Sequence, residues 1–386
     1  MDLKFSDEQE MLRDAVRGIC ERLSDSERVR ELEGDAVGYS VELWRELAQM
    51  DLLGLTIPTE YGGSGMTALE QVIVFMELGR AIAPVPALPT VGFAAPLLVA
   101  SGSDAQKQQW LPRIAGGEAI LSLAWLEPNR GEGAEGVQLA AKPDGDVVRL
   151  SGTKMLVPFA ASADALVVIA RTGDAERDLT LYLVDPKADG VRLEPTATTS
   201  GDASYEVTFD DVEIDVEALI GDVGAGWELF LHAMEETLVY ASALAVGGTE
   251  KVLDLTVEYA KERVQFGVPI GSFQGIAHPI ANVATDLQGA RTLVFQAAWG
   301  LSQERRRLAL SAMTKFHAAE TYRMATRVGH QTFGGIGFTM AIDMQLYFRR
   351  AKQLELTWFG PGALLEFIAA AELDAEVPMI STDLSI

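Results

Sequence analysis

The chain has 386 residues and a formal net charge of −25, from 31 Lys and Arg against 56 Asp and Glu. This acidity argues against nucleic acid or an anionic membrane surface as the main partner, since both carry the same sign of charge. Hydrophobic residues make up 48% of the chain, which excludes a disordered protein and is enough for a large core.

The N-terminal sequence MDLKFSDEQE has neither the basic start nor the apolar stretch of a secretory signal. No apolar run reaches the length of a membrane span, so we expect a cytoplasmic protein without a membrane partner. The single cysteine, Cys20, excludes a disulfide framework and is expected to be buried. The histidines show no metal-ligand spacing and are interpreted as structural or surface residues: His232, His278, His317 and His330.

Residues 1–120 are predicted to form an N-terminal helical domain. Ser6, with Gln9 three places later, is a capping-box pattern that marks a helix start, and apolar residues then recur at helical spacing. The segments VELWRELAQM and TALEQVIVFMELGRAIA repeat that spacing. Between them, IPTEYGGSG (57–65) is expected to be a loop because its proline and glycines interrupt a helix.

Residues 121–225 change in character and predict a middle antiparallel β domain. Short β-branched or alternating runs such as DALVVIART and LTLYLVD are separated by turn sequences such as KPDGD and DPKADG. The sequence therefore places a sheet between two helical regions.

Residues 226–386 are predicted to form a C-terminal helical bundle that also serves as the oligomerisation domain. A long helix is expected over 226–264, with a bend near Gly247 and Gly248. Several predicted helices exceed about 25 residues and have broad apolar faces, which favours a bundle packed against another subunit. The order of helices, strands and helices is typical of an α+β fold in three parts.

The stretch YAKERVQFGVPIGSFQG (259–275) places Arg263, Gln265 and Phe266 at a predicted helix end. A helix C-terminus with an arginine near its negative end would explain this stretch by itself. An arginine that binds phosphate is the functional interpretation, because the guanidinium fork matches the geometry of a phosphate.

The stretch HQTFGGIGFTM (330–340) contains Gly334, Gly335 and Gly337, each of which costs a helix about 1 kcal/mol. A tight turn needs fewer glycines than this. We therefore predict that a ligand or another backbone comes close to the chain beside Gln331. The pattern is not a dinucleotide-binding fingerprint, because no strand precedes it within a βαβ unit.

Together with IPTEYGGSG, these two stretches resemble the acyl-CoA dehydrogenase family, and the order of the three parts extends the resemblance over essentially the whole chain. The resemblance implies an FAD enzyme that oxidises the Cα–Cβ bond of an acyl-CoA and assembles as dimers or dimers of dimers. It also implies that each subunit holds the ADP half of its neighbour's FAD. The residues that match this role are Arg263, Gln274, Gln331, Gly334 and Gly335.

The family's catalytic base is a glutamate that removes the α-proton, and its usual position holds no carboxylate in this chain. That position falls on Phe359 when the alignment is anchored on Gly360. It falls on Trp358 when the alignment is anchored on Arg349 and Lys352. Neither aromatic side chain accepts a proton, so the resemblance assigns no catalytic residue here.

Some family members carry the base on the long helix instead, and that position falls on Thr237. The neighbouring Glu236 remains a candidate displaced base, although a shift of one residue is about 100° of rotation on a helix. Glu355 is a weaker candidate, because it lies four residues before Phe359 and is interpreted as an ordinary charged helix residue.

The stretches that line the flavin ring in the family are also altered. A Thr-Glu-Pro motif is replaced by one that begins with Leu126, and Gly-Ala-Glu stands near the usual Gly-Ser-Asp. A Trp-Ile-Thr motif is replaced by one with Leu156 and Pro158. The hydroxyl and indole donors of these motifs are therefore missing.

The resemblance and its departures predict a heteromer. The chain is similar to the non-catalytic subunit of the α2β2 acyl-CoA dehydrogenases of actinobacterial steroid side-chain degradation. Its implied partners are a catalytic acyl-CoA dehydrogenase subunit, an acyl-CoA bound in the complex and an electron-accepting flavoprotein. Two alternatives stay open: a complete homomeric enzyme with a displaced base such as Glu236, and a non-redox scaffold on this fold.

Overall fold

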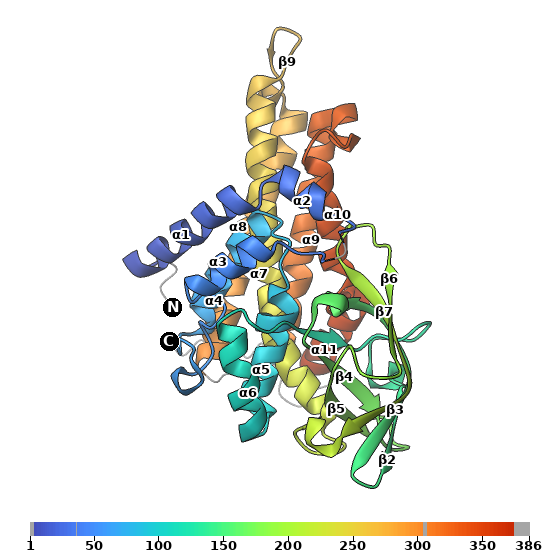
Figure 1. Cartoon of the computed structure of the whole chain (residues 1–386). Helices are drawn as coiled ribbons and strands as arrows, with labels where there is room; N and C mark the ends of the chain where they lie inside the picture. The colour runs from blue at the N-terminus through green and yellow to red at the C-terminus, as the bar shows by residue number, and fades with distance from the viewer. Residues whose placement is uncertain (1–3, 36, 304–306, 374–386) are drawn as a thin grey trace.

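The computed structural model describes residues 4–35, 37–303 and 307–373. Figure 1 shows helices at the N-terminal side, a sheet in the middle of the sequence and a long helical bundle after it. This order confirms the predicted α+β fold.

The first helical part begins where the capping box predicts, since the Ser6 hydroxyl accepts from the Gln9 amide and the Gln9 side chain accepts from the Ser6 amide. A loop with one short 3₁₀ turn occupies residues 57–65, also as expected. Cys20 is buried, and burial raises the pKa of its thiol to about 12. The helices are α1 Asp7–Leu23, α2 Ser26–Leu32, α3 Val41–Gln49, α4 Ala68–Arg80, the π-helical η2 Leu88–Ala94, α5 Ala95–Ser101 and α6 Asp104–Ala115.

The middle part is one sheet in which the path of neighbours is β6-β7-β3-β2-β4-β5-β8, with β1 beside β4. Most neighbours are antiparallel, as predicted, but β1 and β2 both pair parallel with β4. The sheet is therefore mainly antiparallel, as expected, with parallel pairs at β4, because the chain returns to β4 through intervening strands rather than through a hairpin. The strands are β1 Leu121–Ala124, β2 Ala140–Asp144, β3 Val147–Pro158, β4 Ala165–Arg171, β5 Leu179–Val184, β6 Val191–Thr196, β7 Ser204–Asp215 and β8 Leu219–Ile220.

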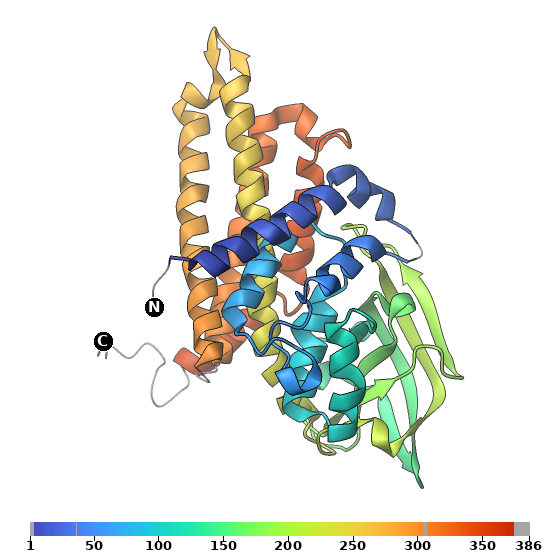
Figure 2. The same cartoon turned by 60° about the vertical axis from the view of Figure 1, so that its left-hand side comes forward.

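The last part is a helical bundle built around α7. Figure 2 shows α7 and α8 extending together beyond the other helices, with a small hairpin at their tip. The elements are α7 Gly226–Glu262, β9 Val264–Gln265, β10 Val268–Pro269, α8 Gln274–Ser302, α9 Leu308–Phe333, α10 Met344–Leu356 and α11 Pro361–Glu372.

The glycines in the middle of α7 serve close packing, and the helix continues through them. A Cβ added to Gly247 would lie 1.8 Å from the carbonyl oxygen of Met76 in α4. A Cβ added to Gly248 would lie 2.4 Å from the ring of Tyr322 in α9. Among the described residues, α7 alone is long and apolar enough to cross a membrane, but 78% of its most apolar window is buried inside the fold. That burial is typical of the central helix of a bundle.

Candidate functional site

The two residues predicted from the 259–275 stretch lie at the projecting tip of the bundle. Arg263 follows the last residue of α7, and Gln274 is the first residue of α8. The β9–β10 hairpin joins them, as Figure 2 shows at the tip of these helices. Both side chains are exposed, so each is available to a molecule outside this chain.

The residues predicted from the 330–340 stretch lie at the end of α9, at the same end of the bundle (Figure 1). Gln331 is exposed on the last turn. Gly334 ends the helix with φ +66°, and a Cβ added to either Gly334 or Gly335 would meet nothing within 4 Å. This backbone is therefore open to an approaching group.

Gly337 has a different role from the other two glycines. A Cβ at Gly337 would lie 2.9 Å from the Cβ of Phe333, so this glycine allows the chain to pack on itself. His330, which is buried, stacks on Phe338 at 4.4 Å and contacts Phe348 edge to face at 5.0 Å. Burial lowers the pKa of His330, which supports the structural interpretation of this histidine.

Two adjoining cavities lie far from this tip, between the three parts of the chain. The inner cavity, about 120 Å³, is bounded by α4, η2 and α10 and includes Phe75 and Leu244 in its wall. The β-side cavity, about 360 Å³, lies between the sheet and α10. The residues that line both cavities mark their junction: Pro158, Asp202, Gln353, Thr357 and Trp358.

The wall of the β-side cavity contains the altered ring-lining positions Leu126, Leu156 and Pro158. Their side chains are apolar and offer no hydrogen bond. Trp125 also lines this cavity, and its buried Nε1–H has no hydrogen-bond partner among the described residues. The three altered positions therefore offer a flavin ring no hydrogen bond, and the polar groups of this wall come from other segments, among them Thr198, Ser204 and Gln353.

Of the two positions predicted for the missing base, only Trp358 faces the cavities. It lies at their junction, and its ring centroid is 6.4 Å from that of Phe93. Phe359 is fully buried instead, in an aromatic cluster that includes Trp125 at 4.9 Å and Phe367 at 4.9 Å. Both Trp358 and Phe359 have positive φ values, 56° and 65°, which are strained for residues with side chains.

The other candidate positions of the base do not reach the junction. The hydroxyl of Thr237 is buried and donates to the carbonyl oxygens of Gly92 and Ala233, both at 2.9 Å. Glu236 accepts a hydrogen bond from the Tyr240 hydroxyl at 2.6 Å and lines neither cavity.

Glu355 belongs to a charged row on the helices rather than to either cavity. It pairs with Lys352 of α10 and lies 3.9 Å from Arg323 of α9. This arrangement agrees with the interpretation of Glu355 as an ordinary charged helix residue.

The loop between α10 and α11 is held by two groups that sequence reasoning missed. The buried ammonium of Lys315 in α9 donates to the carbonyl oxygens of Thr357 at 3.2 Å and Phe359 at 3.4 Å. Burial lowers the pKa of Lys315 to about 8, although nearby carboxylates oppose the shift. Glu132, from the middle part, accepts from the amide of Gly360. Both contacts join distant parts of the sequence, and no local pattern signals them.

A second buried pair fixes the stretch that begins with Leu126. The Nζ of Lys154 donates to Glu127 at 2.7 Å and to the carbonyl oxygen of Trp125 at 3.0 Å. Glu127 also accepts from the backbone amides of Gln138 and Leu139. Burial lowers the pKa of Lys154 to about 8, and the negative charge of Glu127 opposes that shift.

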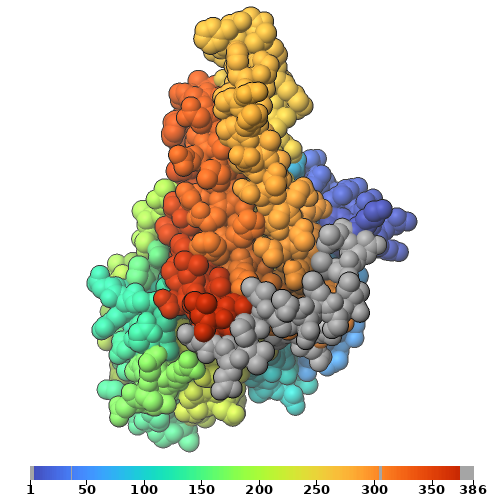
Figure 3. Space-filling model, turned by 180° about the vertical axis from the view of Figure 1, so that it is seen from behind, coloured from blue at the N-terminus to red at the C-terminus, as the bar shows by residue number. Residues whose placement is uncertain are grey.

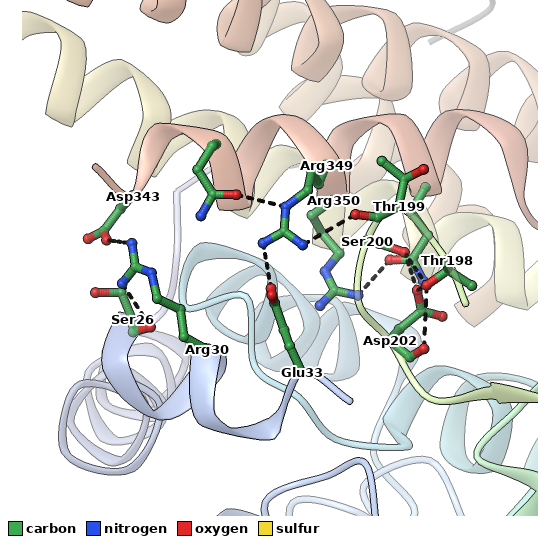
Figure 4. A network of polar contacts seen from close by, with 12 residues as sticks. Ser26, Arg30, Glu33, Thr198, Thr199, Ser200, Asp202, Asp343, Arg349 and Arg350 are labelled. Atoms are coloured by element: carbon green, nitrogen blue, oxygen red, sulfur yellow. Dashed lines mark hydrogen bonds and ion pairs between the residues drawn. The ribbon is translucent and has the colours of Figure 1, made fainter. Parts of the chain in front are cut away.

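A polar network beside the cavities joins all three parts of the chain (Figure 4). Arg349 of α10 pairs with Glu33 at 2.6 Å and donates to the carbonyl oxygen of Thr199 at 3.2 Å. Arg30 of α2 pairs with Asp343 at 2.7 Å. These contacts hold α10, which ends two residues before Trp358, against α2 and the loop between β6 and β7.

Asp202 is the charged member of the cavity junction. Burial by itself would raise the pKa of its carboxyl, but the charge of Arg350 and the hydroxyls of Ser200, Thr198 and Ser204 hold that pKa below the usual value. Asp202 therefore stays ionised and hydrogen-bonded within its own loop, which disfavours a role as a proton acceptor.

Comparison with known proteins gives a consistent result along the chain. Family models match residues 6–118, "Acyl-CoA dehydrogenase, N-terminal domain", 122–212, "Acyl-CoA dehydrogenase, middle domain", and 224–372, "Acyl-CoA dehydrogenase, C-terminal domain". Acyl-CoA dehydrogenase FadE27 of Mycobacterium tuberculosis is 32% identical over 372 residues, which cover 93% of this chain and 95% of that protein.

Two solved structures share the fold over nearly the full length. The ChsE4-ChsE5 complex from Mycobacterium tuberculosis gives a TM-score of 0.88 at 30% identity and covers 98% of this chain and 100% of that one. A Tcur3481-Tcur3483 steroid ACAD variant gives a TM-score of 0.85 at 30% identity and covers 94% and 97%.

Proposed function

This chain belongs to the acyl-CoA dehydrogenase family, and from that premise we propose that it is the non-catalytic subunit of a heteromeric enzyme. FAD is the coenzyme of the family. In the proposed assembly, a catalytic partner supplies the glutamate base and the flavin-ring pocket. This chain supplies the clamp for the ADP half of the partner's FAD.

The proposal depends mainly on Trp358, the indole at the junction of the two cavities. A base in this family must reach the α-carbon of the acyl group beside the flavin, and an indole at that junction neither accepts a proton nor leaves the space free. Phe359, Thr237 and Glu236 offer no replacement there, for the geometric reasons given above.

The tip of the bundle supports the other half of the proposal. Arg263 and Gln274 are exposed at the same end of the bundle as the open backbone of Gly334 and Gly335, and a guanidinium is a favourable partner for a diphosphate. When FAD is bound, its flavin carries the redox chemistry. The residues of this chain would bind and orient its ADP half.

The surface of the bundle favours contact with another subunit. Among the eleven exposed residues of α8, only Asp286 is charged, although 23% of the whole chain is charged. Helix α11 is mostly apolar, yet Leu364 is its single buried residue. Figure 3 shows α8, α9 and α11 together on one face of the molecule. Faces of this composition are typical of subunit interfaces.

The relatives suggest the substrate class. One similar structure is named as a steroid ACAD, and another is a complex of two differently named proteins. We therefore propose that the assembly desaturates an acyl-CoA with a steroid side chain or a comparably bulky acyl group. The electrons would pass to an electron-accepting flavoprotein. We place this assembly in the cytoplasm.

Co-expression with candidate catalytic subunits, followed by a flavin-to-chain ratio, tests the proposal. The heteromer predicts about one FAD for every two chains, and a Glu-to-Gln change in the partner's base would abolish turnover. A homomeric enzyme with a base such as Glu236 predicts about one FAD per chain and activity of this chain alone. A scaffold predicts no flavin and no effect on the partner. Either of the last two results would overturn the proposal.

A further inference from the structure

The carboxylate of Glu132 lies against the beginning of α11. The amide of Gly360, the residue that precedes the helix, donates to both carboxylate oxygens, at 2.9 and 3.1 Å. No side chain from the helix's own N-terminus caps it, and Pro361 has no amide hydrogen to donate. The beginning of a helix attracts anions, and phosphate groups are common occupants. In this chain the occupant is one of its own carboxylates.

A buried cation lies at the same loop. The Lys315 ammonium contacts the carbonyl oxygens of Thr357 and Phe359, directly before Gly360. Burial raises the pKa of Glu132, and the Lys315 charge partly offsets that effect. A helix terminus and a buried lysine thus create a positive environment, and Glu132 reaches it from the middle part of the chain.

The position of Glu132 in the sequence relates its contact with Gly360 to the coenzyme. It belongs to the stretch that in the family borders the coenzyme, which here begins with Leu126. The same stretch contributes apolar walls to the β-side cavity. Neither Glu132 nor Gly360 lines that cavity, but Gly360 lies two residues after Trp358, which does. A diphosphate that reached the beginning of α11 would meet a carboxylate that already holds the Gly360 amide.

We propose that Glu132 is an internal anion that occupies the beginning of α11 and closes this chain's own coenzyme site to a diphosphate. This inference rests on the proposed function, since it explains why an assembly of two chains would hold a single FAD. Glu132 would exclude the coenzyme, whereas the apolar residues Leu126, Leu156 and Pro158 only fail to bind it. The contact of Glu132 with Gly360 also holds the loop between α10 and α11, and with it Trp358 and Phe359, in place without a coenzyme.

The test compares the complex containing Glu132→Ser with the wild-type complex, each co-purified with the catalytic partner. ADP, which carries the diphosphate without the flavin ring, is titrated by calorimetry into the FAD-loaded complexes. We expect the Glu132→Ser complex to bind about one additional ADP for every two chains, at least about tenfold more tightly than the wild-type complex does. Glu132→Gln keeps an acceptor for the Gly360 amide and removes only the charge, and it should give a smaller gain.

Glu135→Ser is the matched control, because Glu135 is an exposed carboxylate of the same loop that does not contact Gly360. It should leave ADP binding unchanged. If neither Glu132 variant gains ADP binding while the complex stays assembled, the inference is wrong and the proposed function still stands. If the wild-type complex carries one FAD per chain or none, the proposed function fails whatever the variants do. An equal gain from Glu135→Ser would indicate a general charge effect and would also overturn the inference.

Discussion

Tyr259 near the end of α7 stacks on Phe333 at the end of α9, with ring centroids 4.2 Å apart and planes inclined by 15°. Tyr259 stands four residues before Arg263, and Phe333 stands directly before Gly334. One aromatic contact therefore joins the two sequence motifs that were predicted to serve the same ligand. It gives the proposed clamp a rigid base although its residues are exposed.

If the proposed clamp holds FAD, substitutions in it should remove flavin from the assembled protein. Arg263→Ala removes a charged fork from the tip, and Gly335→Leu fills the open space above the backbone. Either change should reduce the FAD content of the purified complex at least tenfold, measured by absorbance and chain quantification. Lys261→Ala, an exposed lysine on the same helix, is the control and should have no effect. Undiminished FAD in both variants would remove the clamp from the proposal.

The contact between α4 and α7 predicts a strong effect of a small substitution. Gly247→Ala would place a methyl group 1.8 Å from the Met76 carbonyl oxygen, so the two helices must separate. Alanine favours a helix over glycine by about 1 kcal/mol, but overpacking of this kind costs about 1–3 kcal/mol. We expect a net loss of stability in denaturant titration. A variant as stable as the wild type would show that the helices can move apart freely.

The aromatic cluster predicts graded losses at Phe359. The ring is fully buried, so Phe359→Ala should destabilise the fold by about 3–5 kcal/mol. Phe359→Leu keeps most of the apolar volume and should cost about 1–2 kcal/mol. Thermal unfolding of the complex measures both changes. Equal losses for the two variants would mean that the side chain's volume is not what stabilises this loop.

The buried pair of Lys154 and Glu127 predicts an alkaline effect on stability. Burial lowers the pKa of Lys154 from 10.5 to about 8, so between these values the unfolded chain binds more protons than the folded chain. The contribution of Lys154 to the free energy of unfolding therefore rises as the pH increases through this range. Lys154→Met should be less stable at pH 7, because it leaves the Glu127 carboxylate buried without its cation. The variant should also lack the rise in stability with pH that Lys154 contributes. Unfolding curves collected between about pH 7 and 10 compare the two slopes, and parallel slopes would contradict the assignment.

Local patterns in the sequence predicted the large features of the fold correctly. The capping box at Ser6 and Gln9, the turn-separated strands and the apolar spacing of the long helices all depend on neighbours within a few residues. The tip motifs were found by family resemblance, and their presence at one end of the bundle agrees with a shared role. That role remains a proposal.

Contacts between distant residues could not be predicted in the same way. Glu132 meets Gly360 across 228 positions, and Lys315 meets the loop from 42 to 44 positions away. The parallel pairing of β1 with β4 likewise depends on how the chain returns to the sheet. The glycines at 247 and 248 were expected to bend a helix, because the sequence gives no sign of the backbone and the ring that pack against them.

The packing of α4 on α7 has a consequence for exchange of segments between relatives. Gly79 of α4 faces the Leu244 carbonyl of α7, and Gly247 of α7 faces the Met76 carbonyl of α4. The backbone of each helix therefore packs against a glycine of the other helix. A chimera that takes its first helices from one homologue and its bundle from another will assemble only when both parents keep glycine at these two places. The first and last thirds of the polypeptide are therefore expected to have diversified together rather than as interchangeable modules.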